Sequence, residues 1–137
     1  MAVMDDHKKS LDTYVIVRPE HLNHHGYLFG GQLLKWIDEF AWIGASKTYT
    51  GRTLVTRAMD TIEFKERVIS GSILRFHAFE VKKGNTSVTW EVDVYADEPG
   101  GRDEKEVFST SVTFVCLDAE GNKCGIDCLD DDGGCED

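Results

Sequence analysis

The stretch from His21 to Lys47 reads HLNHHGYLFGGQLLKWIDEFAWIGASK, and it decides the fold. It starts as a loop rich in histidine and glycine. Gly30-Gly31 then opens a run with the apolar spacing of a helix. We expect this helix to extend to about Lys47 or Tyr49. Because the helix is apolar on most of its circumference, other elements have to cover it.

Strand patterns occupy most of the remaining chain. One strand-like run precedes the helix, and several follow it with alternating apolar and polar residues. A single strand before the helix disfavours doubly wound topologies, so we predict an α+β fold with an antiparallel sheet. The expected strands are 13–18, 54–59, 61–64, 72–81, 86–96 and 107–117, with a turn at 82–85 and a loop at 99–101.

The charge balance limits the classes of partner. The chain of 137 residues has a formal net charge of −10, which argues against nucleic acid or an anionic membrane as the main partner. Local clusters of basic residues still leave room for a polyanionic ligand such as a nucleotide. No apolar stretch of signal-peptide length follows Met1, and no run is long enough to span a membrane. We therefore expect a cytoplasmic location.

The end of the sequence differs in composition from the rest. Residues 118–137 contain eight acidic residues and one lysine, and periodicity stops there. We expect one folded domain over residues 1–118, with Cys116 as a small core residue, and a disordered, reduced tail over 119–137. The tail carries Cys124, Cys128 and Cys135, whose spacing fits a metal site poorly, so we expect no metal.

Asp38 departs from the polar face of the predicted helix. At about 100° per residue, the other polar residues share one narrow face, whereas Asp38 falls on a stripe with Gly31, Leu34 and Trp42. A carboxylate on an apolar stripe is costly unless it is paired, hydrogen-bonded or used in chemistry. Two interpretations remain open here: a rim carboxylate held by a neighbouring strand, or a functional group.

The glycine pair at the helix start is a candidate oxyanion site. The first amides of a helix lack internal acceptors, and the helix dipole favours negative charge at that end. Glycine lets a substrate approach this backbone closely. Asp38 lies about two turns further along, roughly 10 Å down the axis. A plain tight turn at Gly30-Gly31 is the alternative.

One spacing joins these residues: Asn23-x2-Gly26-x2-Phe29-Gly30-Gly31, followed by Leu33-Leu34 and by Asp38 seven residues after Gly31. This motif resembles that of the hotdog-fold acyl-CoA hydrolases, most closely the bacterial enzymes related to brain cytosolic acyl-CoA hydrolase. Two weaker matches support it. Gly84-Asn85-Thr86-Ser87 is similar to a family turn that usually reads Gly-Arg-Thr-Ser, and residues 57–64 resemble the strand near the dimer axis. The similarity covers about residues 12–118.

The resemblance implies a fold, an assembly and a site. The fold is a long antiparallel sheet wrapped around one central helix. Two copies join their sheets edge to edge, commonly within a trimer of dimers. Asn23 of one subunit then faces Asp38 of the other, so each dimer holds two composite sites. No cofactor is implied, because coenzyme A belongs to the substrate and the product.

As a hypothesis, the thioester oxygen binds the amides around Gly30-Gly31. Asp38 acts as general base or as nucleophile, and Asn23 orients the water or the carbonyl. The residues that we expect to contact the acyl-CoA are Phe29, Leu34, Arg57, Lys82, Lys83, Gly84, Asn85, Thr86 and Ser87. For each basic residue alone, ordinary surface charge is the alternative, since a phosphate site usually needs several donors.

Two rival functions remain open. A hotdog hydratase or dehydratase would pair a histidine, for which His25 could serve, with a carboxylate. The Asn-Pro-x-His pattern of the hydratases and the proline-rich helix entry of the dehydratases are absent. A non-catalytic acyl-CoA-binding module is the second rival. For His24 and His25 themselves, solvated loop residues are the favoured interpretation.

Overall fold

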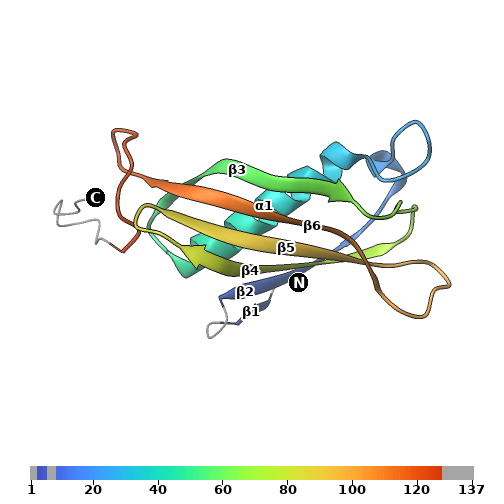
Figure 1. Cartoon of the computed structure of the whole chain (residues 1–137). Helices are drawn as coiled ribbons and strands as arrows, with labels where there is room; N and C mark the ends of the chain where they lie inside the picture. The colour runs from blue at the N-terminus through green and yellow to red at the C-terminus, as the bar shows by residue number, and fades with distance from the viewer. Residues whose placement is uncertain (1–2, 6–8, 128–137) are drawn as a thin grey trace.

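The computed structural model describes residues 3–5 and 9–127, which form one curved sheet and one long helix (Figure 1). The strands pair in the order β1-β2-β4-β5-β6-β3, and all neighbours are antiparallel. The elements are β1 (Val3–Asp5), β2 (Ser10–Ile16), η1 (Pro19–His21), α1 (Gly30–Thr48), β3 (Thr53–Phe64), β4 (Ile73–Lys83), β5 (Ser87–Asp97) and β6 (Lys105–Leu117).

Helix α1 begins and ends where the apolar spacing predicts. Its buried residues are Leu33, Ile37, Ala41, Gly44 and Ala45, which recur every three or four positions and so face the sheet. The contact with β5 is tight at Gly44. A Cβ atom there would lie 2.5 Å from the ring of Trp90, so only glycine fits at this crossing.

The central strands follow the alternation seen in the sequence. In β5, every second residue is buried, including Val88, Trp90, Val92 and Val94. The inner faces of β4 and β6 supply Phe76, Phe108 and other apolar side chains to the same core. The sheet thus wraps around the helix, and the expected α+β hotdog architecture is confirmed.

Strand β3 differs from the sequence-based expectation of two short strands. It is one strand of 12 residues paired with β6, and its register shifts between Thr56 and Ala58 and again between Asp60 and Glu63. Thr61 has a φ of 46°, which marks the second irregularity. The strand was predicted in two pieces because this bulge interrupts the alternation.

Strand β3 also forms one edge of the sheet. Its apolar side chains reach solvent in the single chain: Val55 is 37% exposed, Ile62 49% and Phe64 51%. A long, apolar strand edge with unpaired backbone groups is a template for pairing with another chain.

The bounds of β2 and β4 also differ from those expected from the sequence. The first expected strand, 13–18, is observed as Ser10–Ile16, because Leu11 already packs into the core and the backbone of Val17 turns to bond with Ser72 and Gly71. Lys82 and Lys83, expected in a turn, are the last residues of β4.

The chain remains packed beyond residue 118, where the domain was expected to end. The Ile126 amide donates to the Asn85 carbonyl at 2.9 Å, and the Ile126 side chain is 1% exposed. Residues 119–127 therefore fold back on the sheet, which corrects the prediction of disorder for this part. The rest of the expected tail, 128–137, lies outside the described residues.

A polar cluster holds the C-terminal end of α1, where Tyr49 follows the last helical residue. The Tyr49 hydroxyl donates to Glu80 at 2.6 Å, and Lys9 contacts both side chains. Burial, followed by the hydrogen bond with Glu80, raises the pKa of Tyr49. Among the described residues, no helix has both the length and the apolar character needed to cross a bilayer.

Candidate active site

The loop before α1 is built around Asn23. Its side-chain oxygen accepts the amides of His25 at 2.9 Å and Tyr27 at 3.2 Å, and its own amide donates to the Tyr27 carbonyl. Gly26 completes the turn with a φ of 86°, a conformation that favours glycine. Since the carbonyl oxygen of Asn23 is used by the loop, the side-chain NH2 is the group left to contact a ligand.

The glycine pair lies under two aromatic rings. A Cβ on Gly30 would be 2.9 Å from the Phe64 ring, and one on Gly31 would be 2.6 Å from the Phe29 ring. A larger residue at either position would therefore have to displace an exposed aromatic ring. The Phe29 carbonyl accepts the amides of Gln32 and Leu33. In the described part of the chain, no hydrogen bond occupies the Gly30 and Gly31 amides, as at the start of any α-helix.

A cavity of about 820 Å³ opens beside this helix start. Its walls are apolar at Leu28, Leu33 and Val68, while polar and charged groups lie around it. The lining residues are Asn23, His25, Tyr27, Leu28, Gly30, Leu33, Phe64, Lys65, Glu66, Arg67, Val68 and Val107. Phe64, Lys65 and Arg67 are not among the site residues predicted from the sequence. For the two basic residues, the only signal is the charged run Lys65-Glu66-Arg67 directly after β3.

Asp38 is half-buried where α1 meets β3. The Thr56 hydroxyl of β3 donates to Asp38 Oδ1 at 2.6 Å. The neighbouring Trp42 indole donates to the Leu54 carbonyl at 2.8 Å, so two bonds fasten this side of the helix to the edge strand. Thr56 was missed as a candidate because nothing in its local pattern distinguishes it from other strand threonines.

Within one chain, Asp38 and Asn23 line different hollows. Asp38 borders a smaller one, of about 410 Å³, with Glu39, Trp42 and Ile43, whereas Asn23 borders the larger cavity. The smaller hollow lies beside the exposed edge strand. The single chain therefore does not bring the two expected catalytic side chains together.

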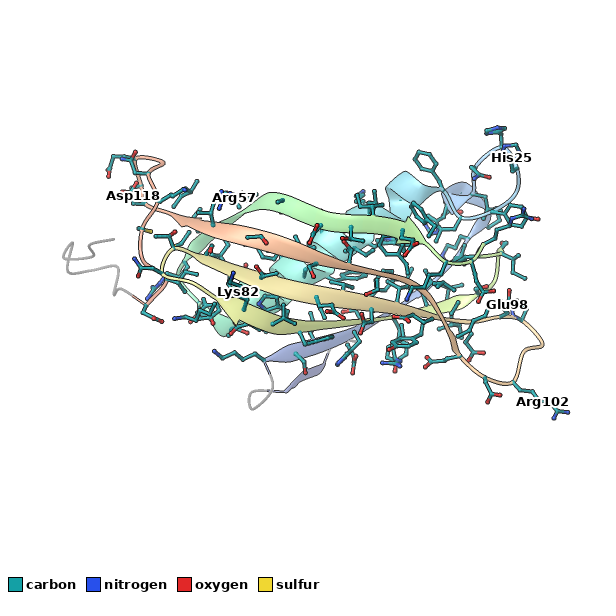
Figure 2. All side chains as sticks on the ribbon, viewed as in Figure 1. His25, Arg57, Lys82, Glu98, Arg102 and Asp118 are labelled. Carbon is teal, nitrogen blue, oxygen red and sulfur yellow. The ribbon has the colours of Figure 1, made fainter. Side chains whose placement is uncertain are left out.

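The expected coenzyme A residues lie away from the Asn23 loop. Figure 2 shows His25 near one end of the molecule and Arg57 and Lys82 toward the other. Lys82 and Arg57 are exposed. Lys83 forms an ion pair with Asp127, and this contact lowers the pKa of Asp127. The cations expected to meet a nucleotide thus share their surface with the returning C-terminal segment.

The turn Gly84-Asn85-Thr86-Ser87 is closed on both sides by backbone bonds. The Gly84 amide donates to the Ser87 carbonyl at 2.8 Å, and the Cys116 amide donates to the Thr86 carbonyl at the same distance. With Ile126 bonded to the Asn85 carbonyl, the carbonyls of Asn85, Thr86 and Ser87 all accept backbone hydrogen bonds. Its side chains, and those of Lys82 and Lys83 beside it, are what a ligand would meet.

The remaining predicted site residues are peripheral or packed. Leu34, which was expected to contact the acyl chain, is partly buried against the core. Leu33 lines the cavity instead. His24 and His25 are exposed, with ring centroids 3.9 Å apart. Among the described residues, no cluster of three or more His, Cys, Asp or Glu side chains could hold a metal ion.

Comparison with known proteins places this geometry in a family. A thioesterase superfamily model matches residues 25–101. An uncharacterized acyl-CoA thioester hydrolase of Zymomonas mobilis is 32% identical over 112 residues, which are 82% of this chain and 74% of the relative. Mouse acyl-coenzyme A thioesterase 11 is 33% identical over 100 residues, but the chain spans only 17% of that protein.

Solved structures give the same result. An acyl-CoA hydrolase from Staphylococcus aureus, in complex with butyryl coenzyme A and coenzyme A, is 30% identical and superposes with a TM-score of 0.78, over 88% of this chain and 74% of that one. A hexameric acyl-CoA thioesterase is 25% identical with a TM-score of 0.80, over 90% of this chain and 80% of that one. The protein described here belongs to the thioesterase superfamily.

Proposed function

We propose that the protein hydrolyses acyl-CoA thioesters, with Asp38 as the catalytic carboxylate. The observation that carries this proposal is the environment of Asp38. Its Oδ1 is held by Thr56 at 2.6 Å, and the side chain borders a hollow beside the free edge of the sheet. Thr56 fixes one carboxylate oxygen, which leaves the other to act on a water or on a carbonyl carbon.

The proposed reaction uses the helix start as its electrophilic partner. The thioester oxygen accepts hydrogen bonds from the Gly30 and Gly31 amides, which stabilise the negative charge that develops on it. Asp38 either takes a proton from the attacking water or forms a mixed anhydride that water then cleaves. Both routes release coenzyme A as a thiol and the acyl group as a carboxylate. Asn23 would orient the water or the carbonyl through its side-chain NH2.

The proposed site needs two copies of the chain. Pairing of two β3 edges around a two-fold axis would continue the sheet and cover Val55, Ile62 and Phe64. The same pairing would bring the Asn23 loop of one copy toward Asp38 of the other, which one chain alone does not do. We therefore propose a homodimer. A trimer of dimers would match the hexameric thioesterase that shares the fold.

Variants of the S. aureus hydrolase have also been solved. In three of them an aspartate, an asparagine or a threonine is replaced by alanine, and the asparagine variant was solved with coenzyme A. Asp38, Asn23 and Thr56 are of the same three residue types. The correspondence supports our proposal for their roles.

Two groups of cations could receive coenzyme A. Lys82 and Lys83 flank the turn expected to contact the nucleotide, while Lys65 and Arg67 lie at the cavity beside Gly30. We propose that the phosphates bind at the turn and that the acyl chain enters the cavity along its apolar wall at Leu28, Leu33 and Val68. A nucleotide phosphate at the turn would compete with Asp127 for Lys83.

We further propose that hydrolysis requires no cofactor and no metal, because coenzyme A arrives with the substrate and a thiolate leaves readily. Turnover should then be unaffected by EDTA. We also propose a cytoplasmic location, in line with a rat relative that is a cytosolic acyl coenzyme A thioester hydrolase by name.

The experiment is a thiol-release assay with the full chain and short, medium, long and aromatic acyl-CoAs. We expect turnover with at least one of them, and a loss of about 10²- to 10⁴-fold in kcat in Asp38→Asn, which keeps the size of the side chain but not its charge. Asp103→Asn, in the exposed loop between β5 and β6, is the matched control and should keep full activity.

Three results would contradict the proposal. An Asp38→Asn variant with wild-type turnover would remove Asp38 from catalysis. Tight acyl-CoA binding without thiol release would indicate a binding module. Hydration of enoyl-CoA without thiol release would indicate a hydratase, with His25 as the next side chain to test.

A further inference from the structure

Two cysteines meet where the chain returns after β6. Asp118 and Asn122 close a turn, and Leu117 then pairs with Lys123 as an isolated antiparallel bridge. The next pair along this short ladder is Cys116 and Cys124. The Cys124 amide donates to the Cys116 carbonyl at 2.9 Å, and the two Sγ atoms lie 3.2 Å apart.

This arrangement is suited to a disulfide. Residues directly opposite each other in an antiparallel pair have Cα atoms about 4.5–5.5 Å apart, which lies within the range that a disulfide bridges. Neither sulfur belongs to a disulfide in the structure. The two sulfurs already point at each other, so rotation of the side chains brings them to bonding distance without moving the backbone far.

The two sulfurs differ in access. Cys116 is 1% exposed within the core of the sheet, whereas Cys124 is only partly buried at its margin. A soluble oxidant would therefore reach Cys124 before Cys116. This order of access is that of an attacking thiol and a resolving thiol.

We propose that Cys116 and Cys124 form a dithiol site that reacts with low-molecular-weight disulfides. The Cys124 thiolate attacks one sulfur of such a disulfide, which gives a mixed disulfide and releases one thiol. Cys116 then attacks the Cys124 sulfur, and its proton goes to the second departing thiolate. In sum, two protein thiols become one disulfide, and one small disulfide is reduced to two thiols.

The bond would fasten the returning segment to the sheet. This segment is held by the Ile126 amide on the Asn85 carbonyl, by Arg52 Nε on the Ile126 carbonyl at 2.6 Å, and by the Lys83–Asp127 pair. All these contacts are non-covalent. The Cys116–Cys124 pair lies at the start of the segment, where the chain turns back after β6. A disulfide there restricts how far the segment can open.

The test uses the reduced chain of 137 residues with oxidised glutathione. Cys128 and Cys135 are replaced by serine so that only the proposed pair can react. We expect both remaining thiols to disappear, the intact mass to fall by two hydrogens, and a Cys116–Cys124 peptide to appear after proteolysis. In this background, Cys116→Ser should stop at one glutathione on Cys124, whereas Cys124→Ser should react far more slowly.

A second measurement follows the segment itself. Oxidation should slow hydrogen exchange at the amides of Cys124 and Ile126 by about tenfold or more, because a disulfide limits local opening. The Cys116→Ser variant, treated identically, should show no such change. The parental chain with all four cysteines should yield the same linked peptide.

Other outcomes would overturn the proposal. One is a stable glutathione adduct on Cys124 while the Cys116 thiol stays reduced. Another is a bond in the parental chain that maps to Cys128 or Cys135 instead. Because the assay measures thiols, mass and exchange, its result does not depend on whether the protein hydrolyses acyl-CoA.

Discussion

Thr56 contacts a single oxygen of the Asp38 carboxylate, and this bond is the first that we would remove. Thr56→Ala should lower kcat about tenfold with little change in KM, because a hydrogen bond to a charged group contributes about 1.5–3 kcal/mol and here it positions the reacting group. Thr56→Ser keeps the hydroxyl and should restore most of the rate. Steady-state kinetics of both variants make the comparison. Equal rates for alanine and serine would show that Thr56 only supports β3.

A second residue-scale prediction concerns Glu91 on the outer face of β5. Its hydrogen bond with Asp93, and then burial and repulsion from Asp93 and Glu106, raise its pKa to about 7 against some relief from Lys65. A raised pKa in the folded state favours the protonated carboxyl. Its contribution to stability is complete below about pH 4.5 and is lost as the pH rises through 7.

Glu91→Gln removes that titration but keeps a donor for Asp93. As the pH rises from 5 to 8, the variant should therefore lose less stability than the parent, above all in the upper part of this range. Thermal unfolding at several pH values measures both. Ser109 donates to the same Asp93 carboxylate at 2.8 Å and remains in both proteins, so it cancels in the comparison. If the stability of both proteins depends on pH in the same way, Glu91 does not titrate in this range.

At the scale of elements, the crossing of α1 and β5 sets the tightest limit on sequence. Gly44→Ala would place a Cβ 2.5 Å from the buried ring of Trp90. Alanine gains about 1 kcal/mol of helix propensity over glycine, but overpacking a core costs typically 1–3 kcal/mol. Because Trp90 is enclosed on all sides, we expect the clash to prevail.

The expected net loss for Gly44→Ala is up to about 2 kcal/mol in the free energy of unfolding. Chemical denaturation checks it, with Lys47→Ala on the exposed side of α1 as a control for helix propensity. A Gly44→Ala variant as stable as the parent would mean that the helix can shift away from β5.

The elements that the sequence predicts correctly are those with strict periodicity. The spacing of Leu33, Ile37 and Ala41 defines α1, and the alternation around Trp90 defines β5, because burial on one face imposes both patterns. Strand β3 lacks such a signal. It lies at an edge, so either face can be polar, and its bulge near Thr61 breaks the alternation.

The candidate site follows the same division. Asn23, Gly30, Gly31 and Asp38 could be proposed from the sequence because one motif fixes their spacing. Thr56 could not, since its contact with Asp38 depends on how β3 lies across the helix, 18 positions later in the chain. The packing of Ile126 under the turn was missed for a similar reason: one apolar residue in an acidic stretch gives no periodicity to detect.

At the scale of the whole molecule, the proposed pairing makes a sharp prediction for mixtures. Asn23→Ala and Asp38→Ala should each be nearly inactive alone. In a mixed dimer, one site carries both substitutions and the other carries neither, so half the sites of that dimer are intact. Random reassembly of equal amounts should recover roughly a quarter of the wild-type activity.

Thiol-release rates after denaturation and refolding of the mixture measure this recovery. Refolding each variant by itself, at the same total concentration, is the control. If Asn23 and Asp38 act within one chain, mixed dimers gain nothing and the mixture stays inactive. Recovery therefore locates the two side chains on different subunits.

The exposed apolar edge of β3 has a consequence for dosage. On the proposed pairing, a solitary chain has unpaired halves of two sites and can turn over nothing. When the protein is scarce relative to the dissociation constant of the dimer, output would rise with the square of its abundance. In that range, a twofold change in expression would change the rate of thioester breakdown about fourfold.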